Sequence, residues 1–267
     1  MNKSGNNEAK YVASLSYGKD SLYMLEVIHE YNLPLDEIVT VDVWATDTIP
    51  AELPPVEDFK KKADEIILKR YGKKVKHLRS KESFESMFYR KHKKGKSVGK
   101  IYGFPCILGA WCNSILKTSV LNKIKGKSYI GYAIDEKNAK RQQKIKEYLN
   151  GNQNNKLLYP LCDYNKTEEE AMKWCKENDL LSPTYLSGNR GGCWFCANQS
   201  EKQLRELRRY YPEYWALLQK WDKDSPRTFK VGNITIDYYN QKFRLEESRK
   251  LVSKNMRRIN SRSDTDE

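Results

Sequence analysis

The stretch "SLSYGKDS", residues 14–21, combines small side chains with one lysine between an apolar run and an amphipathic run. This pattern predicts a turn from a strand into a helix, although a purely structural turn uses the same residue types. Small residues let backbone N–H groups close on phosphate oxygens at a helix N-terminus. Ser21 adds a hydroxyl and Lys19 a mobile charge, so we interpret the loop as a phosphate-binding site.

Six cysteines form a second group with chemical potential, and two of them, Cys193 and Cys196, make a C-x-x-C motif after "NRGG". One such pair is too few for a closed metal site, which takes four ligands. Other thiols must therefore join the pair if it binds a metal. Cys175 lies in an amphipathic helical pattern, which indicates core packing.

The charge is strongly positive, with 49 Lys and Arg against 35 Asp and Glu, and a net charge of +14. Two segments concentrate it: residues 90–100 hold six basic and no acidic residues, and residues 205–262 hold fifteen basic and seven acidic residues. We expect these segments to bind a nucleic acid, RNA or DNA. A biased genome and solvated loops are the alternative explanation.

Short apolar runs alternate with helical patterns up to about residue 183, which predicts βαβ units and a mostly parallel sheet. Thr167 and Glu170 form a capping box. The expected strands are 10–16, 36–44, 73–78, 127–134 and 156–161, and the expected helices are 20–32, 56–72, 109–124, 135–149, 167–178, a pair within 201–221 broken before Pro212, and a basic helix at 242–258. We divide the chain into a nucleotide domain at 8–182, a cysteine-bearing basic helical extension at 183–260 and a disordered tail at 261–267.

No window approaches the roughly 18 apolar residues of a membrane helix, and the opening residues have no apolar core of the kind a signal peptide has. We therefore expect a cytoplasmic protein without a membrane partner. In that compartment thiols bind metal or react more often than they pair.

The pattern Ser-x-Gly-Lys-Asp-Ser at 16–21 resembles the PP-loop of the adenine nucleotide alpha hydrolases, or N-type ATP pyrophosphatases. Together with "VDVWATDTIPAELPP" at 41–55, "YIGYAIDEKNAKR" at 129–141 and "RGGCWFC" at 190–196, it is similar to the phosphoadenosine phosphosulfate (PAPS) reductase family. The similarity is to the reductase-like branch common in bacterial and phage genomes. It implies an α/β fold with a parallel five-stranded Rossmann-like sheet and a small helical extension.

The resemblance also implies a reaction and its residues. Members bind ATP with Mg²⁺ and cleave it between the α and β phosphates, which adenylates an oxygen so that a nitrogen or sulfur nucleophile can displace AMP. Lys19, Asp20 and Ser21 take the catalytic positions. The nucleotide-binding positions are Ser14, Ser16, Tyr17, Gly18, Lys19, Asp20, Ser21, Asp42, Val43, Trp44, Asp135 and Arg190.

By the same resemblance, Cys106, Cys112, Cys193 and Cys196 are the expected ligands of a 4Fe-4S cluster, with zinc as the alternative. The cluster-bearing reductases have adjacent upstream cysteines where this chain has C-x-x-x-x-x-C, so Cys162 is the substitute for Cys106. The reductases of this family also use a cysteine near the carboxyl terminus to attack the sulfonate of the substrate. Here the last thiol is Cys196, which argues against reduction of phosphoadenylyl sulfate by that route.

The favoured interpretation is an adenylating PP-loop enzyme, with sulfur transfer onto a nucleic acid through the cluster and a sulfur or electron donor protein as a further partner. One alternative is a thiol-dependent reductase of adenylyl sulfate compounds. Another is a non-catalytic nucleotide-binding protein that acts in interaction or defence.

Overall fold

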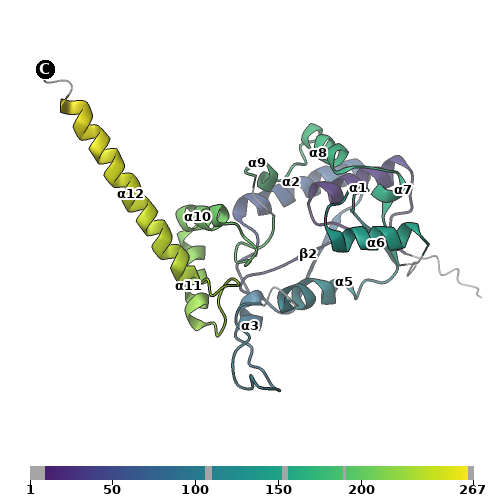
Figure 1. Ribbon diagram of the computed structural model, residues 1–267. Helices are drawn as coiled ribbons and strands as arrows, with labels where there is room; N and C mark the ends of the chain where they lie inside the picture. Colours follow the sequence, from purple (N-terminus) through teal and green to yellow (C-terminus); the bar gives the residue numbers. More distant parts are fainter. Residues whose placement is uncertain (1–9, 106–109, 152–155, 189–190, 264–267) are drawn as a thin grey trace, which may run out of the picture. The chain divides into compact units, whose positions relative to one another are not determined.

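The computed structural model describes residues 10–105, 110–151, 156–188 and 191–263, with side chains up to residue 253 (Figure 1). It divides into two compact units. Unit 1 comprises Met1–Phe84 and Trp111–Cys193, and unit 2 comprises Glu85–Ala110 and Trp194–Glu267. Each unit is described by itself.

A five-stranded, all-parallel sheet forms the centre of unit 1. Its strands are β1 (Tyr11–Ser14), β2 (Glu37–Asp42), β3 (Val75–Arg79), β4 (Lys127–Ile130) and β5 (Leu157–Leu158), in the order β3-β2-β1-β4-β5. This confirms the predicted α/β class with a five-stranded Rossmann-like sheet. The strand order reverses between β1 and β4, and in open parallel sheets ligands bind at such a switch point, beyond the carboxyl ends of the strands.

Helices cover both faces of the sheet. On one face α1 (Lys19–Glu30) and α2 (Pro54–Tyr71) bury a core that includes Ile38, and α7 (Pro160–Asp163), α8 (Glu168–Glu177) and α9 (Pro183–Leu186) pack beside them. Val39, one residue on from Ile38, points to the other face and lines a cavity there with Val120 of α5 (Ser119–Leu121). Helices α4 (Trp111–Asn113) and α6 (Ala139–Leu149) complete unit 1.

Local sequence signals fix several element ends as predicted. Thr167 and Glu170 form the capping box of α8, and Gly72 ends α2 with a φ of 66°. The fifth strand is shorter than predicted because Pro160, which suits the first turn of a helix, begins α7. The helix expected at 109–124 contains a π-helical turn, η1 (Ser114–Thr118), between α4 and α5.

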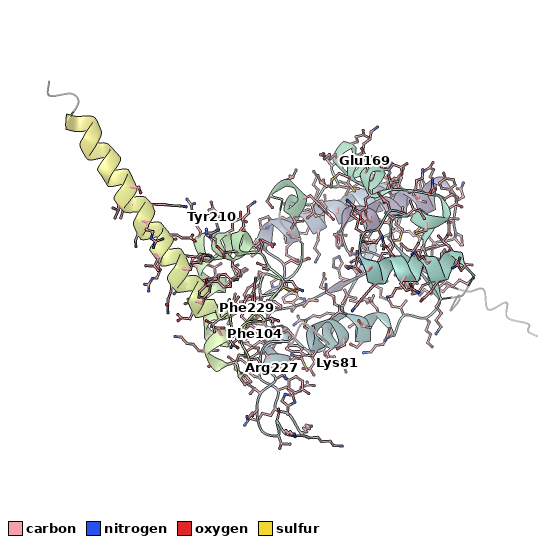
Figure 2. The ribbon with its side chains drawn as sticks, in the orientation of Figure 1. Lys81, Phe104, Glu169, Tyr210, Arg227 and Phe229 are labelled. Carbon is pink, nitrogen blue, oxygen red and sulfur yellow. The ribbon has the colours of Figure 1, made fainter. Side chains whose placement is uncertain are left out.

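Aromatic side chains form the core of unit 2. In Figure 2 Phe104 and Phe229 are labelled, and their ring centroids lie 5.2 Å apart. Trp194 stacks on Trp221 at 5.6 Å, which explains the aromatic residues of the C-x-x-C motif by packing. The helices are α10 (Glu201–Tyr210), α11 (Pro212–Asp224) and α12 (Ile236–Ser263), which is longer than the predicted 242–258, while α3 (Phe84–Phe88) begins at the last residue of unit 1's first segment.

Residues 85–110 fall within the predicted nucleotide domain at 8–182. In the structure, Glu85–Ala110 is part of unit 2 together with the C-terminal helices. Their own contacts explain this: Phe88 packs on Trp221, and the amide of Phe104 donates to Oγ of Ser225. No helix among the described residues is both long and apolar enough to cross a membrane.

Candidate functional site

The loop between β1 and α1 is held in shape by its own serines. The amide of Ser16 donates to Oγ of Ser21 at 3.1 Å, and the Ser21 hydroxyl donates to the carbonyl of Gly18 at 2.9 Å. Between them, Tyr17 has a φ of 55°, in the left-handed region that large side chains rarely adopt. Such strain persists where the surroundings hold it in place, and it concentrates at functional sites.

The end of β4 packs tightly on this loop. A Cβ added to Gly131 would lie 2.7 Å from Cα of Ser21 and 2.8 Å from the carbonyl oxygen of Asp20. Both of those atoms are backbone, so they cannot swing away as a side chain would. Glycine at 131 therefore lets the two strands flanking the switch point bring their following loops into contact.

The N-terminus of α1 offers hydrogen-bond donors to a ligand. The amide of Leu22 donates to Gly18, and the amide of Lys19 donates a long 3.4 Å bond to the Tyr185 hydroxyl. For the amides of Tyr17, Gly18, Asp20 and Ser21, the described part of the chain supplies no acceptor. Unsatisfied amides at the start of a helix, strengthened by its dipole, form an anion-binding site.

Lys19 is buried, with 8% of its surface exposed, and is held by two carboxylates. Its Nζ lies 2.5 Å from Oδ1 of Asp20 and 3.3 Å from Oε2 of Glu168. Burial opposes its charge, but the hydrogen bond to Asp20 and the charges of both carboxylates raise the pKa of Lys19. Burial raises the pKa of Asp20, which Lys19 only partly offsets. Lys19 therefore stays protonated, with a partner that phosphate oxygens can replace.

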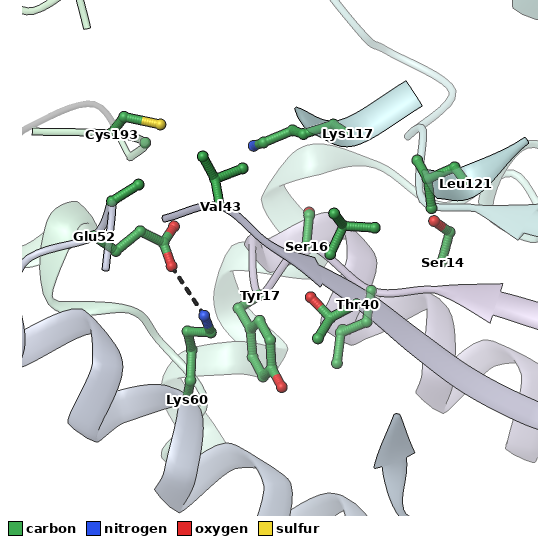
Figure 3. A pocket seen from close by; sticks show the side chains of 14 residues that line it. Ser14, Ser16, Tyr17, Thr40, Val43, Glu52, Lys60, Lys117, Leu121 and Cys193 are labelled. Carbon is green, nitrogen blue, oxygen red and sulfur yellow. Dashed lines mark ion pairs between the residues drawn. The ribbon is translucent and has the colours of Figure 1, made fainter. Parts of the chain in front are cut away.

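A cavity of about 130 Å³ opens beside the loop and is drawn in Figure 3. It lies below the roughly 300–1,000 Å³ of pockets that take whole drug-sized ligands, so it accommodates one ring system and not a complete nucleotide. Five predicted residues line it, namely Ser14, Ser16, Tyr17, Val43 and Cys193. The sequence analysis did not identify Thr40, Glu52, Lys60, Lys117 and Leu121, which line it too.

Two of the unpredicted lining residues are lysines from opposite faces of the sheet. Lys117 belongs to the π-helical turn, and in Figure 3 its side chain extends toward the side of the cavity where Cys193 and Glu52 lie. π-Helical turns occur frequently at functional sites, and the extra residue changes where the following side chains point. The π-helical turn is the local feature that marks Lys117 as a candidate site residue. Because the turn cannot be recognised in the sequence, Lys117 was not predicted.

Lys60 comes from α2, and three carboxylates surround it. Its Nζ lies 2.6 Å from Asp42, 3.3 Å from Glu52 and 3.2 Å from Glu57, and only 5% of its surface is exposed. Burial opposes the charge, but the carboxylates, Glu52 foremost, raise the pKa of Lys60. Figure 3 shows the pair with Glu52 at the cavity wall. The cavity therefore has a fixed ionic wall on the α2 side.

His77 of β3 extends this network to the loop between β1 and α1. Its Nδ1 lies 2.7 Å from Asp42 and its Nε2 lies 2.9 Å from Asp64, while the Tyr17 hydroxyl donates to the same Asp64. Burial lowers the pKa of His77, but hydrogen bonds to both carboxylates outweigh it and the pKa is raised. A chain of hydrogen bonds thus connects the strained residue of the loop to β2, β3 and α2.

Other predicted positions take partners within the protein. Asp42 binds Lys60 and His77, and Trp44 stacks on the guanidinium of Arg79 at 4.2 Å. Oδ1 of Asp135 accepts a hydrogen bond from the amide of Glu168 at the start of α8. The nucleotide contacts of these residues stay predictions. Arg190 lies outside the described residues.

The structure does not test the predicted cluster ligands as a set. Cys106 lies outside it, Cys112 and Cys193 belong to unit 1, and Cys196 belongs to unit 2. Within the described ranges no three His, Cys, Asp or Glu side chains are arranged to hold a metal ion. The substitute ligand Cys162 is buried and donates to the Tyr132 carbonyl, and burial raises its pKa to about 12, which disfavours the thiolate that metals bind.

Cys175 is fully buried in α8, as predicted, and donates to the Lys19 carbonyl. Both the cluster and its ligand set remain predictions.

Comparison with known proteins gives little further information. No family model matches the chain, and no curated protein is similar to it. Among solved structures, it is similar to the U34-tRNA thiolase NcsA from Methanococcus maripaludis with its 4Fe-4S cluster, with 16% identity over 81% of this chain and 72% of that one. The TM-score is 0.39, a similarity too weak to support an inference about function.

Proposed function

We propose that unit 1 binds ATP and cleaves it between the α and β phosphates, adenylating an acceptor. The observation that carries this proposal is the juxtaposition of two features at the carboxyl end of β1: a helix N-terminus with available amides, and a cavity sized for one ring system that residues of β1 and β2 line. The adenine would occupy the cavity, and the phosphates would lie on the amides of Tyr17, Gly18, Asp20 and Ser21.

Lys19 supplies the charge that the reaction needs. In α–β cleavage an acceptor oxygen forms a bond to the α-phosphorus, and the bond from that phosphorus to the bridging oxygen breaks. Pyrophosphate leaves with the electron pair, so negative charge builds on the β-phosphate. A buried, protonated lysine at the phosphate site stabilises that charge more than it stabilises the ground state. Asp20 and Glu168 orient the ammonium until the phosphates arrive.

Magnesium would enter with the nucleotide, because no three carboxylate, histidine or cysteine side chains of the described residues are arranged to hold a metal ion. ATP ordinarily carries Mg²⁺ on its phosphates, and such sites use one or two protein carboxylates at most. Asp20 is the nearest candidate, since its carboxylate already lies at the start of α1.

A nucleic acid is the acceptor class that the proposal favours, because the chain carries a net charge of +14. Sulfur transfer through a 4Fe-4S cluster belongs to the same proposal. The adenylation step itself needs no cluster.

The test is incubation with ATP labelled at the α-phosphate, with Mg²⁺ and with or without bulk RNA and DNA, followed by separation of AMP from ADP. We expect AMP and pyrophosphate, more of both with one polymer, and loss of both in Lys19→Ala. Lys123→Ala, which removes an exposed lysine of the same unit, is the matched control and should keep wild-type turnover. Measured ATP binding with no AMP under any condition would contradict the enzymatic proposal.

A further inference from the structure

Residues 90–102 of unit 2 form a basic loop whose two arms lie side by side, the basic ribbon. Its arms are joined by hydrogen bonds from the amide of Tyr102 to Arg90, from the amide of His92 to Lys100 and from the amide of Gly99 to His92, at 2.9–3.0 Å. Bridges between Lys91 and Ile101 and between His92 and Val98 accompany them. The segment belongs to no helix or strand of the described chain, so it is a loop, and these hydrogen bonds hold its two arms together.

The base of the ribbon is anchored in the aromatic core of unit 2. The amide of Gly103 donates to Phe88, and the Tyr89 hydroxyl donates to Asp224 at 2.5 Å. Gly103 has a φ of 64°, and a Cβ there would lie 2.6 Å from Pro226 and from Oγ of Ser225. Gly103 therefore packs directly against Ser225 and Pro226, and this contact fixes the position of the base of the ribbon.

The lysine charges of the ribbon are available to a partner. It carries Arg90 and five lysines, 91, 93, 94, 96 and 100, with no acidic residue, and all six side chains belong to exposed residues. None of the five lysines has a carboxylate within ion-pair distance in the described part of the chain. The rings of His92 and Tyr102 lie 4.4 Å apart between the arms.

The other basic segment, 205–262, differs in this respect. Arg205 pairs with Glu201 and Glu246, and Arg208 pairs with Glu247 at 2.5 Å. Lys242 pairs with Glu201. Arg205, Arg208 and Lys242 are therefore held in ion pairs, and their bonds to Glu246, Glu247 and Glu201 join α10 to α12. The segment also holds seven acidic residues, whereas residues 90–100 hold none.

We infer that the basic ribbon, and not the C-terminal helices, is the main contact with the phosphodiester backbone of a nucleic acid. This inference deepens the proposed function, on whose acceptor class it rests. Lysines that neutralise phosphates release condensed counterions, which drives binding and makes it salt-dependent.

The test is fluorescence anisotropy with a labelled DNA duplex, an RNA stem-loop and the corresponding single strands, over a series of salt concentrations. The ribbon variant is Lys93→Gln, Lys94→Gln and Lys96→Gln, which changes exposed side chains only. The matched variant is Lys223→Gln, Arg244→Gln and Lys250→Gln, which removes the same charge from exposed positions of the C-terminal segment. Circular dichroism checks that both variants keep the wild-type fold.

We expect the ribbon variant to lose about tenfold or more in affinity and its slope of log K against log salt to fall by about 3, one for each lost phosphate contact. The matched variant should stay within about threefold of wild type. The probe that binds most tightly shows whether the phosphodiester backbone belongs to DNA or RNA, and to a duplex or a single strand. Wild-type affinity in the ribbon variant, or an equal loss in the matched variant, would overturn the inference.

The two proposals fail separately. ATP binding is measured on the same preparations, and neither triple variant changes a residue of the nucleotide site. Wild-type protein that binds ATP but no nucleic acid refutes the ribbon inference alone. Salt-dependent binding through the ribbon without any ATP binding refutes the proposed nucleotide chemistry and leaves the ribbon inference standing.

Discussion

The hydroxyl of Tyr17 donates a 2.5 Å hydrogen bond to Oδ1 of Asp64, which ties the loop after β1 to the second half of helix α2. The bond joins residues 47 positions apart in the sequence, and its donor, Tyr17, has its own backbone in the left-handed region. Because a tyrosine resists that conformation, the bond to Asp64 is part of what keeps the loop in place.

Replacing Tyr17 with phenylalanine removes this bond and keeps the ring. We expect the free energy of unfolding to fall by about 1.5–3 kcal/mol, the range for a hydrogen bond to a charged group, and ATP to bind more weakly because the loop relaxes. Denaturant melts and ATP titrations measure the two effects.

The control is Tyr129→Phe, which removes a hydrogen bond to the Pro34 carbonyl in the same unit. It should cost about 0.5–1.5 kcal/mol of stability and leave ATP affinity unchanged. Equal ATP affinity in both variants would show that the bond to Asp64 does not position the loop.

His77 makes the stability of unit 1 depend on pH. Its two ring nitrogens lie between Asp42 and Asp64, with the Tyr17 hydroxyl 3.3 Å from Nε2, and its pKa is raised in the folded state. The protonated ring is therefore favoured by folding. Its contribution is fully present below the unfolded pKa of about 6.5 and is lost as the pH rises through the higher folded pKa.

Urea denaturation of wild type and His77→Gln between pH 5.5 and 8.5 tests this. The stability lost in the variant should be largest at the acid end of the range and shrink as the pH rises. A difference that stays constant with pH, or grows toward pH 8.5, would contradict a charged histidine between the two carboxylates.

The residues that sequence reasoning found and missed differ in one physical respect. The loop 14–21, the capping box of Thr167 and Glu170 and the C-cap Gly72 are set by neighbours within a few residues, so their patterns are local. Glu52, Lys60 and Lys117 come from separate elements and share only the cavity that they line, so no local pattern in the sequence indicates them. Lys60 sits in a run of three lysines that reads as solvated surface, yet its side chain is 6% exposed while that of Lys61 is 77% exposed.

That contrast gives a paired experiment. Lys60→Met leaves the carboxylates of Asp42, Glu52 and Glu57 without their shared cation, and we expect a loss of about 3–5 kcal/mol, as for breaking a buried ion pair from one side. Lys61→Met removes one exposed pair with Asp58 and should cost less than about 1 kcal/mol. Similar losses in the two variants would mean that Lys60 is not the centre of a buried network.

Gly131 tests whether the contact between the two loops at the switch point is needed. In Gly131→Ala the new methyl would meet the backbone of Asp20 and Ser21 within 2.8 Å, so the loop after β1 or the end of β4 must shift. We expect the free energy of unfolding to fall by about 1–3 kcal/mol from overpacking. Because the displaced amides no longer converge on one anion, we expect the loss of ATP affinity to be larger than the loss of stability.

Gly191→Ala is the control, since a Cβ there meets nothing closer than Oγ1 of Thr184 at 3.8 Å. If Gly131→Ala binds ATP as tightly as Gly191→Ala does, the phosphates do not lie on the N-terminus of α1, and the site proposed here is wrong.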